Sequence, residues 1–99
     1  MMNDDFIKRM LSKFIVNNAF SIIEQGFENQ DAKTLFEGAH SLKGVSGNLA
    51  LTRLFDKTCV VVEAVRDYEH IKEFDLREEM KELKDIYLLV KSNIEALIK

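Results

Sequence analysis

One histidine stands next to an unusual group of glycines. Gly44 and Gly47 follow His40 at steps of four and three residues, and Lys33 and Glu37 precede it at similar steps. On a helix, residues at these spacings lie on one face. A glycine inside a helix costs about 1 kcal/mol relative to alanine. The pattern therefore predicts an imidazole beside a strip without side chains, which another molecule can approach closely.

The apolar residues around His40 predict which way it points. At about 100° per residue they form an arc opposite the histidine, made of Leu35, Ala39, Leu42, Val45, Ser46 and Leu49. Lys43 lies at the flank of the exposed face, where its ammonium can reach an anion attached to the imidazole. Because a neutral imidazole is nucleophilic near pH 7, the chemistry indicated is nucleophilic attack. The alternative is an ordinary surface histidine near a helix end.

The string A-H-S-L-K-G-V-S-G-N-L around His40 resembles the signature of histidine-containing phosphotransfer (HPt) domains, A-H-x-L-K-G followed by N-L-G. The resemblance implies that His40 accepts a phosphoryl group from an aspartyl phosphate on a receiver domain and passes it to another receiver. Lys43 would neutralise phosphoryl charge. The receiver would bring the acceptor aspartate and its Mg²⁺, so no intrinsic cofactor and no metal site are expected in this chain.

Other residues near His40 have expected roles in docking or in holding the helix end. Gly44 and Gly47 would clear a path for the rim of the receiver's active site, and Lys33 and Glu37 would lie in the docking surface. The residues expected to hold the helix end or the following loop are Ser46 and Asn48.

One position departs from the family signature. The family usually has glycine after Asn-Leu, whereas this chain has Ala50. If the position needs a positive φ, alanine would be strained there. The turn would then differ locally, which affects the helix boundary more than the chemistry.

Composition indicates one small all-α domain over residues 1–99. The 99 residues include no proline and only four glycines, and Leu, Ile, Glu and Lys are frequent. The net charge is −3 and no basic cluster stands out, so a nucleic-acid partner is not expected. The single cysteine, Cys59, suits a reducing compartment. Without a membrane-spanning run or a signal peptide, a cytoplasmic protein is expected.

The N-terminal apolar residues form two stripes on nearly opposite sides of one helical wheel. The first contains Phe6, Ile7, Met10, Leu11 and Phe14, and the second contains Ile15, Ala19, Ile22, Ile23, Gly26 and Phe27. One straight helix could not bury both stripes. We therefore expect a short first helix capped by Asn3, a break near Ser12 with Ser12 as the next cap, and a second helix to about Glu28. Phe14 stays in phase with the first stripe and is expected to pack under the short helix; the alternative is that it remains partly exposed.

Caps and apolar spacing predict three further helices. Asp31 is expected to cap the histidine helix over 32–49, and Thr52 the next one. In that fourth helix Thr58 falls on the inner face, where its hydroxyl can bond the carbonyl one turn back. After a connection over 68–74 that contains His70, Asp75 and Glu78 resemble a capping box. A long amphipathic helix then reaches the C-terminus, with Leu76, Met80, Leu83, Tyr87, Val90, Ile94 and Leu97 on its apolar stripe.

These elements predict an antiparallel four-helix bundle with a short additional N-terminal helix laid across one end. HPt domains share this fold. Every strong apolar stripe has a use inside one bundle, so a monomer is expected.

The function predicted is that of a histidine phosphocarrier between receiver domains. A sensor histidine kinase would supply the phosphoryl group. No Gly-rich nucleotide loop or acidic metal cluster is visible, so the chain is not expected to be an enzyme. One alternative is the phosphoacceptor module of a hybrid or chemotaxis-type sensor kinase; the doubled Met and the short C-terminus favour a free-standing protein. The other alternative is a helical adaptor that never carries phosphate.

Overall fold

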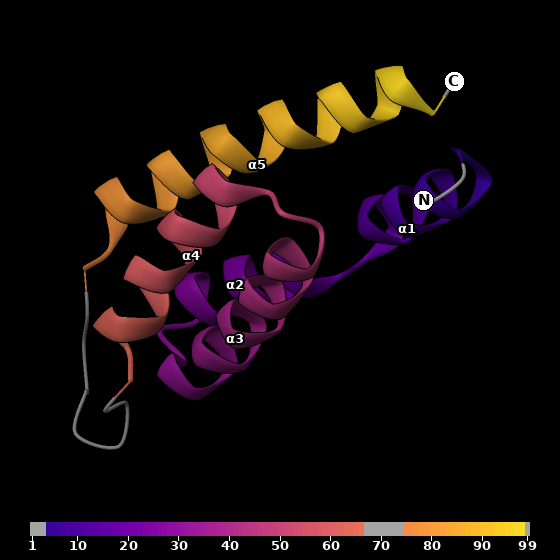
Figure 1. Cartoon of the computed structure of the whole chain (residues 1–99). Helices are drawn as coiled ribbons and strands as arrows, with labels where there is room; N and C mark the ends of the chain where they lie inside the picture. The colour runs from indigo at the N-terminus through magenta and orange to yellow at the C-terminus, as the bar shows by residue number, and fades with distance from the viewer. Residues whose placement is uncertain (1–3, 67–74, 99) are drawn as a thin grey trace.

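The fold consists of helices throughout the part of the chain that the structure describes. The structure is a computed structural model, and it describes residues 4–66 and 75–98. Its helices are α1 (Asp4–Val16), α2 (Ala19–Glu28), α3 (Ala32–Asn48), α4 (Thr52–Ala64) and α5 (Arg77–Leu97). Helices α2 to α5 form an antiparallel four-helix bundle, and α1 lies beside the C-terminal part of α5 (Figure 1). The prediction of an all-α bundle is confirmed. The expected connection over 68–74, with His70, lies outside the described residues.

Aromatic rings join α1, α2 and α5 in the core. The ring of Tyr87 on α5 stacks on Phe20 of α2, with centroids 4.2 Å apart and planes at 7°. Phe14 of α1 meets the same tyrosine at 5.7 Å and is only 1% exposed. Burial raises the pKa of the Tyr87 hydroxyl, and the charge of Glu24 raises it further. Phe14 is therefore buried as predicted, but it belongs to the first helix instead of packing under it, and it links α1 to the bundle.

Glycine allows α2 and α3 to pack with their backbones close together. A Cβ added at Gly26 would lie 2.4 Å from the backbone N of Leu35, and one at Gly38 would lie 2.9 Å from the backbone N of Ile23. Both distances are too short for a real side chain, and the near atoms belong to backbone that cannot rotate away. These two glycines therefore serve helix packing on the buried side of α3.

The apolar arcs predicted for the later helices mostly face the core. On α4, Thr58 is fully buried and its Oγ1 donates to the carbonyl oxygen of Leu54 at 2.6 Å, as expected. On α5 the stripe is buried from Met80 to Ile94, apart from half-buried Val90, but Leu97 is 68% exposed. Among the described residues no buried side-chain N or O atom lacks a hydrogen-bond partner. The core is thus apolar, with its few polar groups satisfied.

The predicted break near Ser12 is wrong. Helix α1 continues through Ser12 to Val16, and the chain turns at Asn17 and Asn18, where Asn17 Oδ1 accepts a hydrogen bond from the N–H of Ala19 at 2.8 Å. The first apolar stripe does not require a break, because α1 extends past the bundle beside α5 instead of lying across its end (Figure 1). Phe6 and Ile7 remain about 40% exposed there.

The predicted caps agree with the structure at one of the four helix starts that it can check, and Asn3, the cap expected for the first helix, lies outside the described residues. Asp31 caps α3, accepting from the N–H of Thr34 at 3.2 Å and from its hydroxyl at 2.7 Å. Thr52 is instead the first helical residue of α4, after an N-cap at Leu51 that makes no side-chain cap bond.

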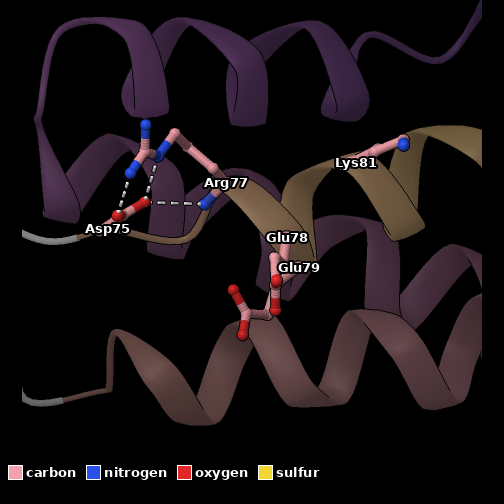
Figure 2. Close-up of a pocket in the computed structure, with 5 residues that line it drawn as sticks. All are labelled: Asp75, Arg77, Glu78, Glu79 and Lys81. Carbon is pink, nitrogen blue, oxygen red and sulfur yellow. Dashed lines mark hydrogen bonds and ion pairs between the residues drawn. The ribbon is translucent and has the colours of Figure 1, made fainter.

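The capping box predicted at Asp75 and Glu78 is also wrong. The Asp75 carboxylate accepts the backbone N–H and the guanidinium of Arg77, as Figure 2 shows. The N-cap of α5 is Leu76, which makes no side-chain cap bond. Hydrogen bonds from Arg77 hold the pKa of Asp75 below its ordinary value. The helix therefore starts one residue later than a capping box at Asp75 and Glu78 requires, and the Asp75 carboxylate bonds Arg77.

None of the helices in residues 4–66 and 75–98 combines the length and the apolar character that a membrane crossing requires.

Candidate functional site

His40 lies in the middle of α3 on the exposed side of that helix. The residues opposite it are buried: Leu35, Ala39, Leu42 and Ser46 are at most 1% exposed, while Val45 and Leu49 are half-buried. The arc predicted from helical spacing therefore faces the core. Because that arc holds α3 against the bundle, the imidazole is left facing solvent.

The two glycines beyond His40 have different surroundings. A Cβ added at Gly44 would meet no other atom within 4 Å, so this turn is open. A Cβ added at Gly47 would lie 3.2 Å from the ring of Phe55, which belongs to α4. Both glycines are exposed. The predicted strip is thus open at Gly44, while at Gly47 a phenylalanine from the neighbouring helix borders it.

A second phenylalanine lies on the other side of His40 along the helix. The rings of Phe36 and His40 stack with centroids 6.0 Å apart and planes at 26°. Neither Phe36 nor Phe55 was assigned to the site from the sequence. Spacing of four residues could have identified Phe36, but Phe55 lies on another helix and has no local signal.

Charged side chains surround the exposed face of α3. Lys43 is half-buried at its flank, and Lys33 and Glu37 are exposed. None of the ion pairs among the described residues involves these three side chains. The Lys43 ammonium is therefore not committed to a carboxylate of the described chain and can interact with an incoming anion.

Ser46 supports the turn that carries Lys43. Its side chain is fully buried, and Oγ donates to the carbonyl oxygens of Leu42 at 2.8 Å and Lys43 at 3.2 Å. Asn48 is the last residue of α3 and is exposed. Ser46 thus acts inside the helix, through the backbone behind the exposed face.

The turn after the site has a left-handed residue that is not glycine. Ala50 has φ = 56°. Its N–H donates to Gly47 at 3.1 Å and the N–H of Leu51 donates to Ser46 at 2.9 Å, which is the pattern of a Schellman helix end. The turn therefore has the positive φ for which glycine is suited, and alanine occupies it despite the steric cost.

The described residues hold no group of three or more His, Cys, Asp and Glu side chains suited to a metal ion. The pocket drawn in Figure 2 is lined by Asp75, Arg77, Glu78, Glu79 and Lys81, all from the start of α5 and the residues before it. It does not include His40. The chemistry available at the exposed face is that of an imidazole, a lysine and an open backbone surface.

Comparison with protein families shows a match to the Hpt domain over residues 10–86. Comparisons with curated proteins and with solved structures give no match. The matched segment begins within α1, ends within α5 and contains the whole of α3 with its exposed histidine. Because this match covers well over half of the residues, the chain belongs to the Hpt domain family.

Proposed function

We propose that this chain carries a phosphoryl group on His40 between receiver domains of a two-component phosphorelay. Membership of the Hpt family supports a phosphotransfer module of two-component signalling, since Hpt domains are phosphocarriers rather than enzymes. The observation that supports the role of His40 is its position on the exposed face of α3, one turn before a glycine whose surroundings are open. An aspartyl phosphate held in another protein can reach such a residue.

In the bond-making step this chain supplies the nucleophile. The lone pair of the unprotonated ring nitrogen forms the N–P bond as the P–O bond to the receiver's aspartate breaks. The carboxylate leaves with that electron pair, and the imidazole proton stays on the other ring nitrogen. Transfer to a second receiver is the same exchange in reverse. Phosphoryl transfer depends mainly on positioning and on neutralising the phosphoryl oxygens.

This chain and the receiver each contribute groups that neutralise the phosphoryl charge and position the reaction. Lys43 lies at the flank of the exposed face and places a positive charge near the phosphoryl group. The receiver supplies the aspartate and its Mg²⁺. Gly44 admits the rim of the receiver's active site, and Lys33 and Glu37 contact the receiver beside it. One copy of this chain acts as a monomer, and a sensor histidine kinase supplies the phosphoryl group upstream.

The test is to incubate the chain with a panel of phosphorylated receiver domains and follow the label. We expect transfer of a label that is stable in alkali and labile in acid, as phosphohistidine is, and no transfer to His40→Gln. Circular dichroism of that variant should show an intact bundle, because the replaced side chain faces solvent.

Two results would contradict the proposal in different ways. Label that persists in folded His40→Gln would place the acceptor elsewhere. A folded wild-type chain that takes no label from any receiver, but does so from a separate kinase with ATP, would make it the phosphoacceptor module of a sensor kinase.

A further inference from the structure

An aromatic ring stacks against the histidine that we assign as phosphoacceptor. Phe36 precedes His40 by one helical turn, and the ring centroids are 6.0 Å apart with planes at 26°. This is an offset stack within the usual range for aromatic pairs. Phe36 is itself half-buried and packs against the core of the bundle. The ring that contacts the imidazole is therefore held in place by the rest of the protein.

A solvent-facing imidazole without such a contact changes rotamer on the picosecond to nanosecond scale. In a helix its first side-chain torsion has two common values, near 180° and −60°. A stack on the residue four positions earlier favours the rotamer that makes the contact. The typical strength of such pairs corresponds to a preference of about fivefold.

We propose that Phe36 is a positioning residue for phosphoryl transfer, whose ring holds the His40 imidazole in one rotamer. The inference rests on the proposed function of His40. In-line attack on phosphorus needs the ring nitrogen at one place and in one direction when the receiver docks. Phe36 does not touch the phosphoryl group. It acts through the imidazole: by favouring one rotamer, it lowers the share of His40 side chains that point the wrong way when the receiver docks.

A purely structural role for Phe36 makes different predictions. Because the side chain also packs against the core, its replacement lowers stability in both cases. Only the positioning role changes the rotamers of His40 and the transfer rate at saturating receiver. Phe27 provides a matched control, since it is another half-buried phenylalanine packed against the same core, on α2.

The experiment compares wild type, Phe36→Leu, Phe36→Tyr and Phe27→Leu. Three-bond NMR couplings report the His40 rotamers without any phosphorylation, and transfer from a phosphorylated receiver is followed over a range of receiver concentrations. For Phe36→Leu we expect averaged rotamers. The saturating rate should be about twofold lower, because a preference of about fivefold fills the productive rotamer to roughly five sixths, whereas an equal mixture fills it to about one half. The receiver concentration for half-maximal rate should not change, because the docking surface is intact. Phe36→Tyr keeps the ring and should restore both values, and Phe27→Leu should lose only stability.

The possible outcomes separate the positioning role of Phe36 from the proposed function of His40. Wild-type His40 that already averages over its rotamers overturns the positioning role without any variant. The positioning role is also overturned if the wild type accepts label and folded Phe36→Leu has the same His40 rotamers and the same transfer rate. A folded wild type that accepts no label overturns the proposed function of His40, and with it the assignment of Phe36.

Discussion

At the scale of single residues, the four glycines of this chain have different roles although all lie in helices. Gly26 and Gly38 are buried and let backbones approach, whereas Gly44 faces open space. Helix propensity disfavours all of them by about 1 kcal/mol relative to alanine. At Gly44 no packing within the described chain accounts for this cost. Under the proposed function, access for a receiver accounts for it.

Replacing Gly44 by leucine should therefore stabilise the protein and impair its function. A Cβ at this position meets no atom within 4 Å and a helix favours leucine over glycine, so the free energy of unfolding should rise by about 1 kcal/mol. The same side chain would stand where a receiver docks, and transfer should fall by at least about tenfold. Urea unfolding and transfer kinetics measure the two effects. Gly44→Ala adds one methyl group, and its transfer rate should lie between those of wild type and Gly44→Leu. A wild-type transfer rate in Gly44→Leu would contradict the role of the open turn.

Lys43 should affect the chemical step more than docking. We expect Lys43→Ala to lower the saturating transfer rate by about tenfold, because positive charge near the phosphoryl oxygens stabilises the transition state more than the bound receiver. The dissociation constant of the unphosphorylated receiver should change little. Lys43→Arg keeps the charge and should retain most of the rate. Transfer kinetics equal to wild type in Lys43→Ala would remove this residue from the site.

At the scale of elements, the turns that begin and end α3 determine how firmly the histidine helix is held. Two of these turn residues, Gln30 and Ala50, have positive φ without being glycine. A left-handed conformation costs a residue with a Cβ about 1 kcal/mol or more. We expect Ala50→Gly to raise the unfolding free energy by about 1 kcal/mol and the melting temperature by about 4–8 °C for a domain of this size.

The control for Ala50→Gly is an alanine inside α4 or α5. Ala96 is exposed in the last turn of α5, and its replacement by glycine should lower stability slightly instead of raising it. A decrease in melting temperature for Ala50→Gly would mean that the turn does not have its positive φ in solution.

The start of α3 should make stability depend on pH. Hydrogen bonds from Thr34 hold the pKa of the Asp31 carboxyl below its ordinary value. A group with a lowered pKa in the folded state stabilises that state above its unfolded pKa, and this contribution is lost as pH falls through the folded pKa. Urea midpoints of wild type should therefore decrease between about pH 5 and about pH 2. Asp31→Asn can still cap but cannot titrate, and should decrease less.

The contrast between α3 and α1 explains which elements the sequence could predict. The signals of α3 are local: Asp31 caps it, its apolar spacing agrees with the buried face, and the positive φ at Ala50 matches the position where the family usually has glycine. At the N-terminus the spacing showed two opposed apolar stripes. Whether both must be buried, and so whether the helix must break, depends on where the helix lies in the fold. Since α1 extends beside α5, its first stripe could stay partly exposed and Ser12 did not have to break the helix. The contacts of Phe55 with Gly47 depend on tertiary packing in the same way.

At the scale of the whole molecule, the protein is a compact bundle with a two-helix extension. Its Cα radius of gyration is 14.1 Å, whereas a globular domain of this length is expected at about 13 Å. In Figure 1 α1 and the C-terminal half of α5 extend beyond α2, α3 and α4. The site lies on α3, within the bundle. Folding of the bundle and attachment of α1 can therefore be separated.

The contact of Phe14 with Tyr87 should determine whether α1 stays attached. Phe14 is 1% exposed and lies near the end of α1, while Phe6 and Ile7 near its start are about 40% exposed. Helix α1 therefore has less buried area to hold it than the bundle helices have, and local opening should cost less free energy there. In native-state hydrogen exchange, the amides of α1 should exchange faster than those of α3.

Replacing Phe14 by alanine tests this division of the molecule. Removing a buried phenylalanine costs about 3–5 kcal/mol. If α1 opens separately, the loss should appear mainly as lost protection in α1, while α3 keeps most of its protection and His40 still accepts label. The matched control is Phe20→Ala, which removes the other ring that contacts Tyr87 from within the bundle and should lower protection in every helix. Equal loss in α1 and α3 for Phe14→Ala would show instead that α1 and the bundle unfold as one cooperative unit.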